Sequence, residues 1–257
     1  MTTLNVADGS PIQMDPWIDF GVLQTNGLVT SNSGRKVVVA VGGGAFTLLG
    51  SGFGGFDAQG LPTTGVIEKI VGSNGGENLL SIAGLSIDMA TFRYHMEAHD
   101  GAEFLDLMFG GADVISGADQ NDRLVGNAGD DLLRGFEGDD FLSGEAGQDT
   151  LVGAKGKDRF VFDSAAGSTA LAPDLISDLH NNDKIDVKRI DADLTTSGDQ
   201  AFVIVGAALT GDPGQMAGSY DSSRDVTVAV GDVDGDGVAD LMIEMDGNHL
   251  DFTNWIL

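Results

Sequence analysis

The chain has 257 residues, of which 40 are acidic and 13 are basic, and its formal net charge is −27. Because nucleic acids and anionic membranes are bound through Lys and Arg, this charge disfavours both as partners and favours divalent cations. Apolar residues make up 42% of the chain and cysteine is absent, which indicates a buried core without disulfides, thiolate metal sites or thiol nucleophiles.

The first 107 residues are predicted to form an N-terminal β cap. β-Branched runs bounded by Gly, Ser and Asn predict strands at 35–41, 65–71 and 78–87. A short helix is expected near 86–97, where Ser86 can cap the first turn and apolar residues recur on one face.

Residues 108–161 form six consecutive nine-residue units, starting at 108, 117, 126, 135, 144 and 153. The eighth position is apolar in every unit, and the first and fourth are Gly in five of six, with Met108 and Gln120 as the exceptions. The sixth position is always aspartate: Asp113, Asp122, Asp131, Asp140, Asp149 and Asp158. The repeated glycines are Gly111, Gly117, Gly126, Gly129, Gly135, Gly138, Gly144, Gly147, Gly153 and Gly156.

This pattern predicts stacked turns joined by short strands. Gly lets the backbone turn tightly and present its carbonyls, while the apolar eighth position points into a core between two sheets. Carbonyl and carboxylate oxygens then gather in rows at the turns, which suits calcium. A metal-free array is disfavoured, because ionised carboxylates a few Å apart repel one another.

The units resemble the RTX nonapeptide, Gly-Gly-x-Gly-x-Asp-x-Leu-x, of proteins exported by Gram-negative type I secretion. The resemblance implies a parallel β-roll in which calcium lies between loops two units apart, giving about four ions here. The second position departs from Gly in Ala118, Asn127, Phe136, Glu145 and Ala154. Binding is expected to survive there because the backbone carbonyls remain, whereas Gln120 is the larger departure.

Residues 162–257 are predicted to form a C-terminal β cap. The segments "DRFVFDSAAGST", "DLISDLHNNDKIDVKRID" and "GDVDGDGVADLMIEMDG" are similar to the C-terminal domain of serralysin-type proteases. That resemblance implies that Asp163 and Asp174, which follow the last repeat, complete the outermost calcium sites.

A second acidic motif, "DVDGDGVAD", places Asp232, Asp234 and Asp236 at positions 1, 3 and 5 of an EF-hand-like loop. Position 12 is Ile243, where an EF-hand needs a bidentate Glu. Metal binding and a Gly-rich hairpin turn with solvated aspartates remain equally compatible with this motif.

The chain ends in Asn254, Trp255, Ile256 and Leu257, and its start lacks the basic and apolar segments of a cleaved secretory signal. No apolar run approaches the length of a membrane span. The resemblance implies an uncleaved C-terminal export signal, so we expect the type I secretion apparatus as a partner and an extracellular or cell-surface location. The initial Met favours a complete chain over a fragment of a longer RTX enzyme.

Catalytic motifs are sparse. "HMEAH" gives His95 and His99 helical i, i+4 spacing, but Glu97 is misplaced for a metalloprotease base and no third histidine follows at the family's spacing. No lipase elbow, phosphate loop or dinucleotide fingerprint is present.

We therefore predict a non-enzymatic, all-β calcium protein with a β-roll between two caps. It is expected to fold on calcium outside the cell and to self-associate as a surface-layer, matrix or filament subunit. The alternative is a small extracellular polysaccharide-acting enzyme with its site in residues 1–107.

Overall fold

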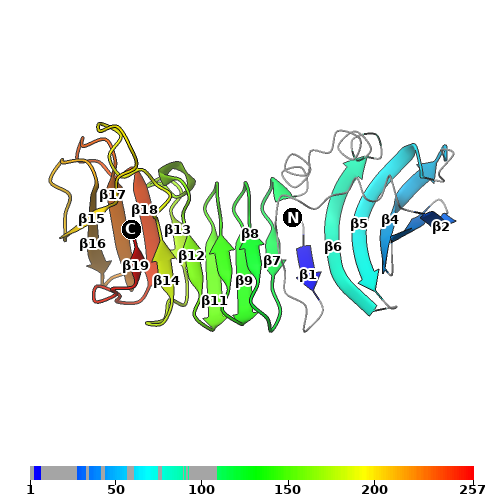
Figure 1. The fold of residues 1–257 in the computed structure, drawn as a ribbon, viewed down its shortest axis with the longest axis horizontal. Helices are drawn as coiled ribbons and strands as arrows, with labels where there is room; N and C mark the ends of the chain where they lie inside the picture. Colours follow the sequence, from blue (N-terminus) through cyan, green and yellow to red (C-terminus); the bar gives the residue numbers. More distant parts are fainter. Residues whose placement is uncertain are drawn as a thin grey trace.

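The computed structural model describes residues 3–6, 28–32, 35–41, 44–56, 61–74, 77–88, 90, 92 and 109–257. Its regular structure is almost entirely β, with one short 3-10 helix, η1 (Ala165–Gly167), which confirms the all-β prediction. The strands stack along the long axis of an elongated molecule (Figure 1).

The described strands form two sheets. The larger has, in spatial order, β15 (Val203–Gly206), β16 (Gln215–Asp221), β17 (Val226–Asp232), β18 (Leu241–Asp246), β13 (Asp174–Ile176), β11 (Thr150–Lys155), β9 (Leu132–Glu137), β7 (Val114–Ser116), β1 (Thr3–Val6), β6 (Glu77–Asp88), β5 (Thr64–Asn74), β4 (Gly44–Gly54), β3 (Lys36–Val41) and β2 (Leu28–Asn32). The smaller has β19 (Trp255–Ile256), β14 (Lys184–Asp186), β12 (Arg159–Val161), β10 (Phe141–Ser143) and β8 (Arg123–Val125).

The nine-residue repeat generates a parallel β-roll. Successive units send their strands alternately to the larger sheet (β7, β9, β11) and to the smaller sheet (β8, β10, β12). Each strand pairs in parallel with the strand two units on, as in Leu133 with Leu151 and Leu124 with Leu142. One turn of the roll is therefore two repeats, and turns of one kind lie above one another along each side.

The core of the roll is a stack of the apolar eighth positions. These six side chains are fully buried between the two sheets: Ile115, Leu124, Leu133, Leu142, Leu151 and Phe160. Because the side chains of a strand alternate between faces, the one apolar eighth-position residue of each unit is enough to fill the narrow space between the sheets.

The roll continues past the last repeat with strands that are distant in sequence. β13 and β14 pair with β11 and β12, and β18 and β19 then pair in parallel with β13 and β14. Trp255 thus lies beside Ile185, so the C-terminal residues form the last strand of the smaller sheet. At the other end, β1 pairs in parallel with β7 and antiparallel with β6, which joins the roll to the β2–β6 meander.

The predicted helix near 86–97 is wrong at its start. Ser86 lies within β6, which runs through Asp88 because its residues pair with β5 up to Val66–Asp88. Ala90 and Phe92 have helical backbone, and Phe92 is buried. The remainder of the predicted helix, with His95, Glu97 and His99, lies outside the described residues.

Candidate metal centre

Buried aspartates form two rows, one on each side of the roll. Row one is Asp113, Asp131, Asp149 and Asp174, and row two is Asp122, Asp140, Asp158 and Asp183; all eight side chains are at most 3% exposed. Within a row, each aspartate accepts a hydrogen bond through Oδ1 from the backbone N–H of the preceding member, at 2.7 to 3.0 Å. This repeated bond fixes the carboxylates in register from one turn of the roll to the next.

The second oxygen of several row members has no hydrogen-bond donor among the described residues. Oδ2 is buried and unpartnered in Asp131, Asp140, Asp149 and Asp158. A buried carboxylate oxygen without a donor is costly unless a cation satisfies it. These oxygens recur at the strand spacing along each row, so the rows are suited to hard divalent cations.

The repeated glycines make room for these carboxylates. A Cβ on Gly126 would collide with Asp131 Oδ2 and with the Gly144 carbonyl oxygen, and Gly117, Gly135, Gly144 and Gly153 are crowded by their own unit's aspartate in the same way. The fourth-position glycines Gly129, Gly138, Gly147 and Gly156 have φ between 117° and 156° and lie against the backbone of the fourth residue two units earlier. Carbonyl oxygens therefore line the same turns as the aspartates, as the sequence predicts. Gly111 differs, because a Cβ there would have no atom of the described residues within 4 Å.

The departures at the second position have a structural consequence. Asn127, Phe136, Glu145 and Ala154 all adopt left-handed backbone, with φ between 65° and 77°. The turn requires this conformation, in which a side chain clashes with its own backbone, whereas Gly takes it freely. The repeat therefore carries strain at four successive turns.

The turn of the second unit is built differently. Ala118 and Gln120 are absent from the positive-φ residues, as are Phe109 and Gly111 at the same places in the first unit. Ala118 N donates to Asp122 Oδ2 at 2.7 Å, whereas Oδ2 is unpartnered in Asp131, Asp140, Asp149 and Asp158. Gln120 marks this loop as the larger departure in the sequence, and the Ala118–Asp122 hydrogen bond distinguishes it in the structure.

Burial and mutual repulsion raise the pKa of the row aspartates. Loss of solvation, together with a smaller contribution from neighbouring row members, raises the pKa of Asp131 and of Asp174 to about 8. Loss of solvation likewise raises the pKa of Asp140 to about 7 and those of Asp149 and Asp158 to about 6. Burial in the rows therefore disfavours the ionised carboxylates, and a cation held between them would favour that form.

The two aspartates carried over from the serralysin resemblance have different surroundings. Asp174 joins row one, where it accepts from Asp149 N at 2.9 Å. Asp163 lies outside both rows and pairs with Arg189 at 2.8 Å, while its Oδ1 is buried without a donor. Loss of solvation raises the pKa of Glu145, and the nearby carboxylate of Asp163 adds a smaller increase.

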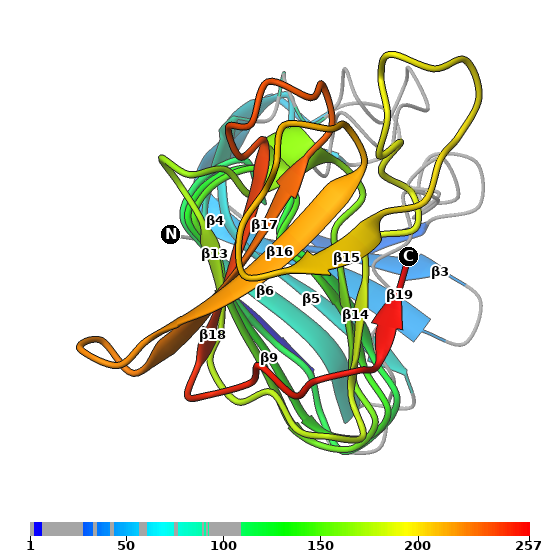
Figure 2. The same cartoon turned by 90° about the vertical axis from the view of Figure 1, so that its left-hand side faces the viewer.

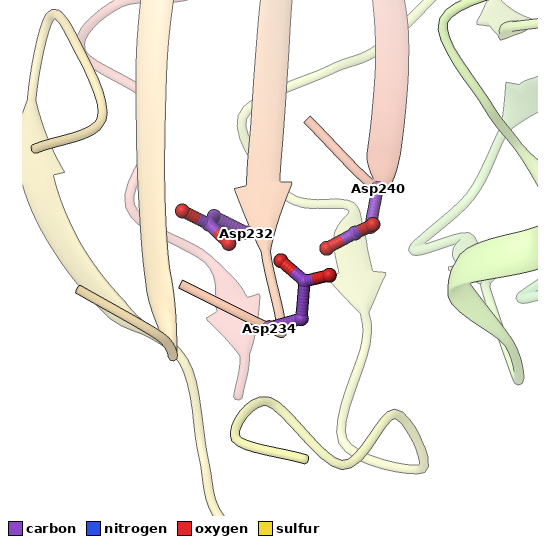
Figure 3. A group of neighbouring side chains, drawn as sticks. All are labelled: Asp232, Asp234 and Asp240. Atoms are coloured by element: carbon purple, nitrogen blue, oxygen red, sulfur yellow. The ribbon is translucent and has the colours of Figure 1, made fainter. Parts of the chain in front are cut away.

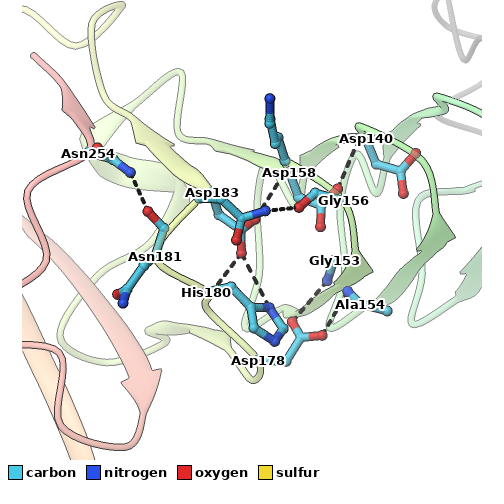
Figure 4. A network of polar contacts seen from close by, with 12 residues as sticks. Asp140, Gly153, Ala154, Gly156, Asp158, Asp178, His180, Asn181, Asp183 and Asn254 are labelled. Carbon is cyan, nitrogen blue, oxygen red and sulfur yellow. Dashed lines mark hydrogen bonds and ion pairs between the residues drawn. The ribbon is translucent and has the colours of Figure 1, made fainter.

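Two functional candidates were missed by sequence reasoning. Asp183 ends row two, and Asp178 accepts from Gly153 N and Ala154 N at 2.9 and 2.7 Å (Figure 4). Asp183 stands two residues before buried Ile185, as Asp174 stands two before Ile176. This shared Asp-x-apolar spacing was the available signal.

The motif "DVDGDGVAD" gathers Asp232, Asp234 and Asp240 at one turn, with carboxylate oxygens within 4.8 Å of one another (Figure 3). Asp240 was not among the predicted ligands. Asp236 is not in the group and accepts from Val238 N. Both oxygens of buried Asp232 accept backbone N–H bonds, from Gly235 and Gly237. These bonds are those of a self-stabilised turn, so metal binding here stays a prediction.

The family model of the serralysin C-terminal region of M10 peptidases matches residues 50–257. The chain belongs to this family. The family corresponds to the RTX-type, non-catalytic C-terminal part of the serralysins, and not to their protease domain. This result confirms the resemblance inferred from the sequence.

Solved structures with a similar fold include two subunits of the Azotobacter vinelandii mannuronan C5-epimerase. The AlgE6R3 subunit is 23% identical with a TM-score of 0.43, and the match covers 58% of this chain and 79% of that chain. The AlgE6R2 subunit is 27% identical with a TM-score of 0.39, covering 55% and 89%. A search of curated proteins gave no match. Within the described residues, no helix is long and apolar enough to cross a membrane.

Proposed function

We propose that this serralysin C-terminal family member is a secreted calcium-binding protein whose β-roll folds when calcium enters the two aspartate rows. In the absence of calcium the crowded carboxylates favour a loose chain. Calcium that binds only the folded roll stabilises it by mass action, and this stabilisation grows with calcium concentration. Folding would thus follow export into a calcium-rich medium.

The observation that carries this proposal is the repeated unpartnered Oδ2. Four buried aspartates, two in each row, present this oxygen beside the carbonyl-lined glycine turns. Oxygen ligands of this kind, with several carboxylates per site, are those that calcium prefers in proteins. Within the repeats, the proposed ligands are the six aspartates and the turn carbonyls near the repeated glycines, with about four ions in total. Asp163 and Asp174 are proposed at the outer sites, and Asp232 and Asp234 at a separate one.

Secretion and self-association belong to the proposal as well. Families of this type are exported proteins, and the C-terminal residues expected to carry the export signal form β19 in the folded chain. The chain is proposed to consist of an N-terminal cap (1–107), a roll (108–161) and a C-terminal cap (162–257). Self-association as a surface-layer, matrix or filament subunit is favoured by β15, which has a single strand partner among the described residues and so leaves one end of the larger sheet unpaired there. The enzymatic alternative, with a site in residues 1–107, is not better supported, because the matched family is a non-catalytic region.

A matched pair of variants tests calcium binding. Asp131 and Asp130 are neighbours in one loop, but only Asp131 is buried in a row, whereas Asp130 is exposed. Asp131→Asn is expected to weaken calcium affinity at least about tenfold, or about 1.4 kcal/mol, because it removes a charged ligand. Asp130→Asn, with the same chemical change, is expected to alter it little.

Calorimetric titration and far-UV circular dichroism in chelator and in millimolar calcium provide the measurements. Equal calcium affinity of the two variants, or a wild-type chain equally folded without calcium at alkaline pH, would contradict the proposal.

A further inference from the structure

The end strand of the larger sheet is apolar on both of its faces. β15 pairs with β16 alone among the described strands, and all four of its residues are exposed. Val203 is 62% exposed, Ile204 51% and Val205 40%. Because successive side chains of a strand point to opposite faces, three consecutive exposed apolar residues leave both faces uncovered.

This strand is held in place without burying these three side chains. Phe202, which precedes it, is buried against Gly231, and Val203 N donates to Gly214 O at 2.8 Å. The backbone N–H groups of successive strand residues point to opposite sides of the strand. Because the Val203 N–H points to Gly214, the Ile204 N–H is expected to point to the unpaired edge. The edge thus offers backbone hydrogen-bonding groups as well as apolar side chains.

An apolar hollow adjoins the same strand. It has a volume of about 320 Å³, and its lining includes Ile204 and Gly206 of the strand together with His249, Leu250 and Trp255. His249 is its only ionisable lining residue, and the ring binds the Asp246 carbonyl oxygen of its own turn at 2.7 Å. Leu250 is itself 56% exposed, so the hollow and the strand form one continuous apolar surface.

The distribution of charge along the chain favours a second copy of this chain as the partner for this surface. Residues 200–211 contain no charged side chain, although the whole chain has a net charge of −27. Copies of so acidic a chain repel one another, and they approach with least cost where charge is absent from both. Natural edge strands are usually protected by Lys, Pro or a covering segment, and β15 contains neither residue. Figure 2 shows this strand at the end of the molecule that faces the viewer.

We propose that β15 is a self-association surface whose occupant is the β15 strand of a second copy of this chain. A strand edge meets an identical edge about a two-fold axis, which makes the pair antiparallel and joins the two larger sheets into one. Apolar side chains of each copy then cover the hollow of the other. This inference rests on the self-association included in the proposed function and names the contact through which it begins.

Light scattering coupled to size-exclusion chromatography in calcium, over about a hundredfold range of protein concentration, tests the contact. The wild-type mass is expected to rise from one chain to two or more. Ile204→Lys is expected to weaken association at least about tenfold, because it places a charge in an apolar contact. Val203→Lys, on the same strand but outside the hollow, should act in the same direction. Leu171→Lys is the control, since Leu171 is an exposed apolar residue (99%) that lies on a turn and lines no part of the hollow.

The outcomes separate the contact from the wider proposal. If association persists in both β15 variants, the contact is wrong, although self-association stands. A wild-type chain that stays monomeric at every concentration refutes self-association and the contact together. Circular dichroism of the same samples with and without calcium reports folding independently, so neither result is confused with a failure of calcium binding.

Discussion

Calcium removal at alkaline pH is expected to unfold the roll. Adjacent members of an aspartate row lie on neighbouring turns, whose spacing is about 4.8 Å. Two unit charges at that distance repel by about 3.5 kcal/mol at an effective dielectric constant of about 20. Each row of four has three such pairs, so full ionisation of both rows amounts to about 20 kcal/mol. That repulsion exceeds the free energy of unfolding of a typical domain, which is about 5 to 15 kcal/mol.

The pKa shifts give the sign of the pH dependence. The row aspartates start from about 3.8 in the unfolded chain, and burial raises the folded-state pKa of Asp149 to about 6, of Asp140 to about 7 and of Asp131 to about 8. A carboxyl with a raised folded-state pKa stabilises the fold fully below its unfolded pKa and loses that contribution as pH rises through the folded value. The calcium-free roll should therefore be most stable at about pH 4 or below, and its stability should fall as pH rises from about 4 to about 8.

The assay is a urea titration of protein freed of calcium on a chelating resin, followed by far-UV circular dichroism at acid and alkaline pH. The urea midpoint is expected to fall with rising pH in the calcium-free protein and to be restored by calcium at alkaline pH. A calcium-free midpoint that is unchanged or higher at alkaline pH would refute the reasoning, because it would show that row repulsion does not oppose folding.

Four further predictions concern single features of the roll. Phe136→Gly is expected to raise stability by about 1 kcal/mol in urea titrations with calcium, because Phe136 is exposed and has φ 77°; a lower midpoint would contradict the strain. Gly126→Ala should lower calcium affinity and the urea midpoint, because its Cβ would meet Asp131 Oδ2, whereas Gly111→Ala should change neither. Leu142→Ala should cost about 2 to 5 kcal/mol in the calcium-bound form, since Leu142 is fully buried. Deleting residues 255–257 should lower the thermal midpoint by removing β19 and should retain the chain inside the producing cell; normal export of the shortened chain would contradict a C-terminal signal.

The sequence by itself determined the roll. The nine-residue period with aspartate at the sixth position and an apolar residue at the eighth can be satisfied only if every unit places one side chain in a core and one at a turn. Asp131 and Leu133 occupy those places in the structure, and Asp149 and Leu151 repeat them two units on. A local, repeated pattern is readable because each unit contacts only its neighbours in the stack.

Only the tertiary structure decided how the roll ends. β18 and β19 pair with β13 and β14 across about seventy residues of intervening chain, as in Ile185 with Trp255, and no local pattern encodes such a pairing. Asp183 belongs to row two because the chain continues the roll beyond the last repeat. Its position two residues before Ile185 indicates a row aspartate only when β14 is known to extend the roll. Asp163 also follows the last repeat, but it lies outside both rows and pairs with Arg189, a contact that its place in the sequence does not encode. The left-handed backbone at Phe136 and Glu145 is likewise decided by the tertiary structure, because stacking of the turns imposes a conformation that those residues would not adopt alone.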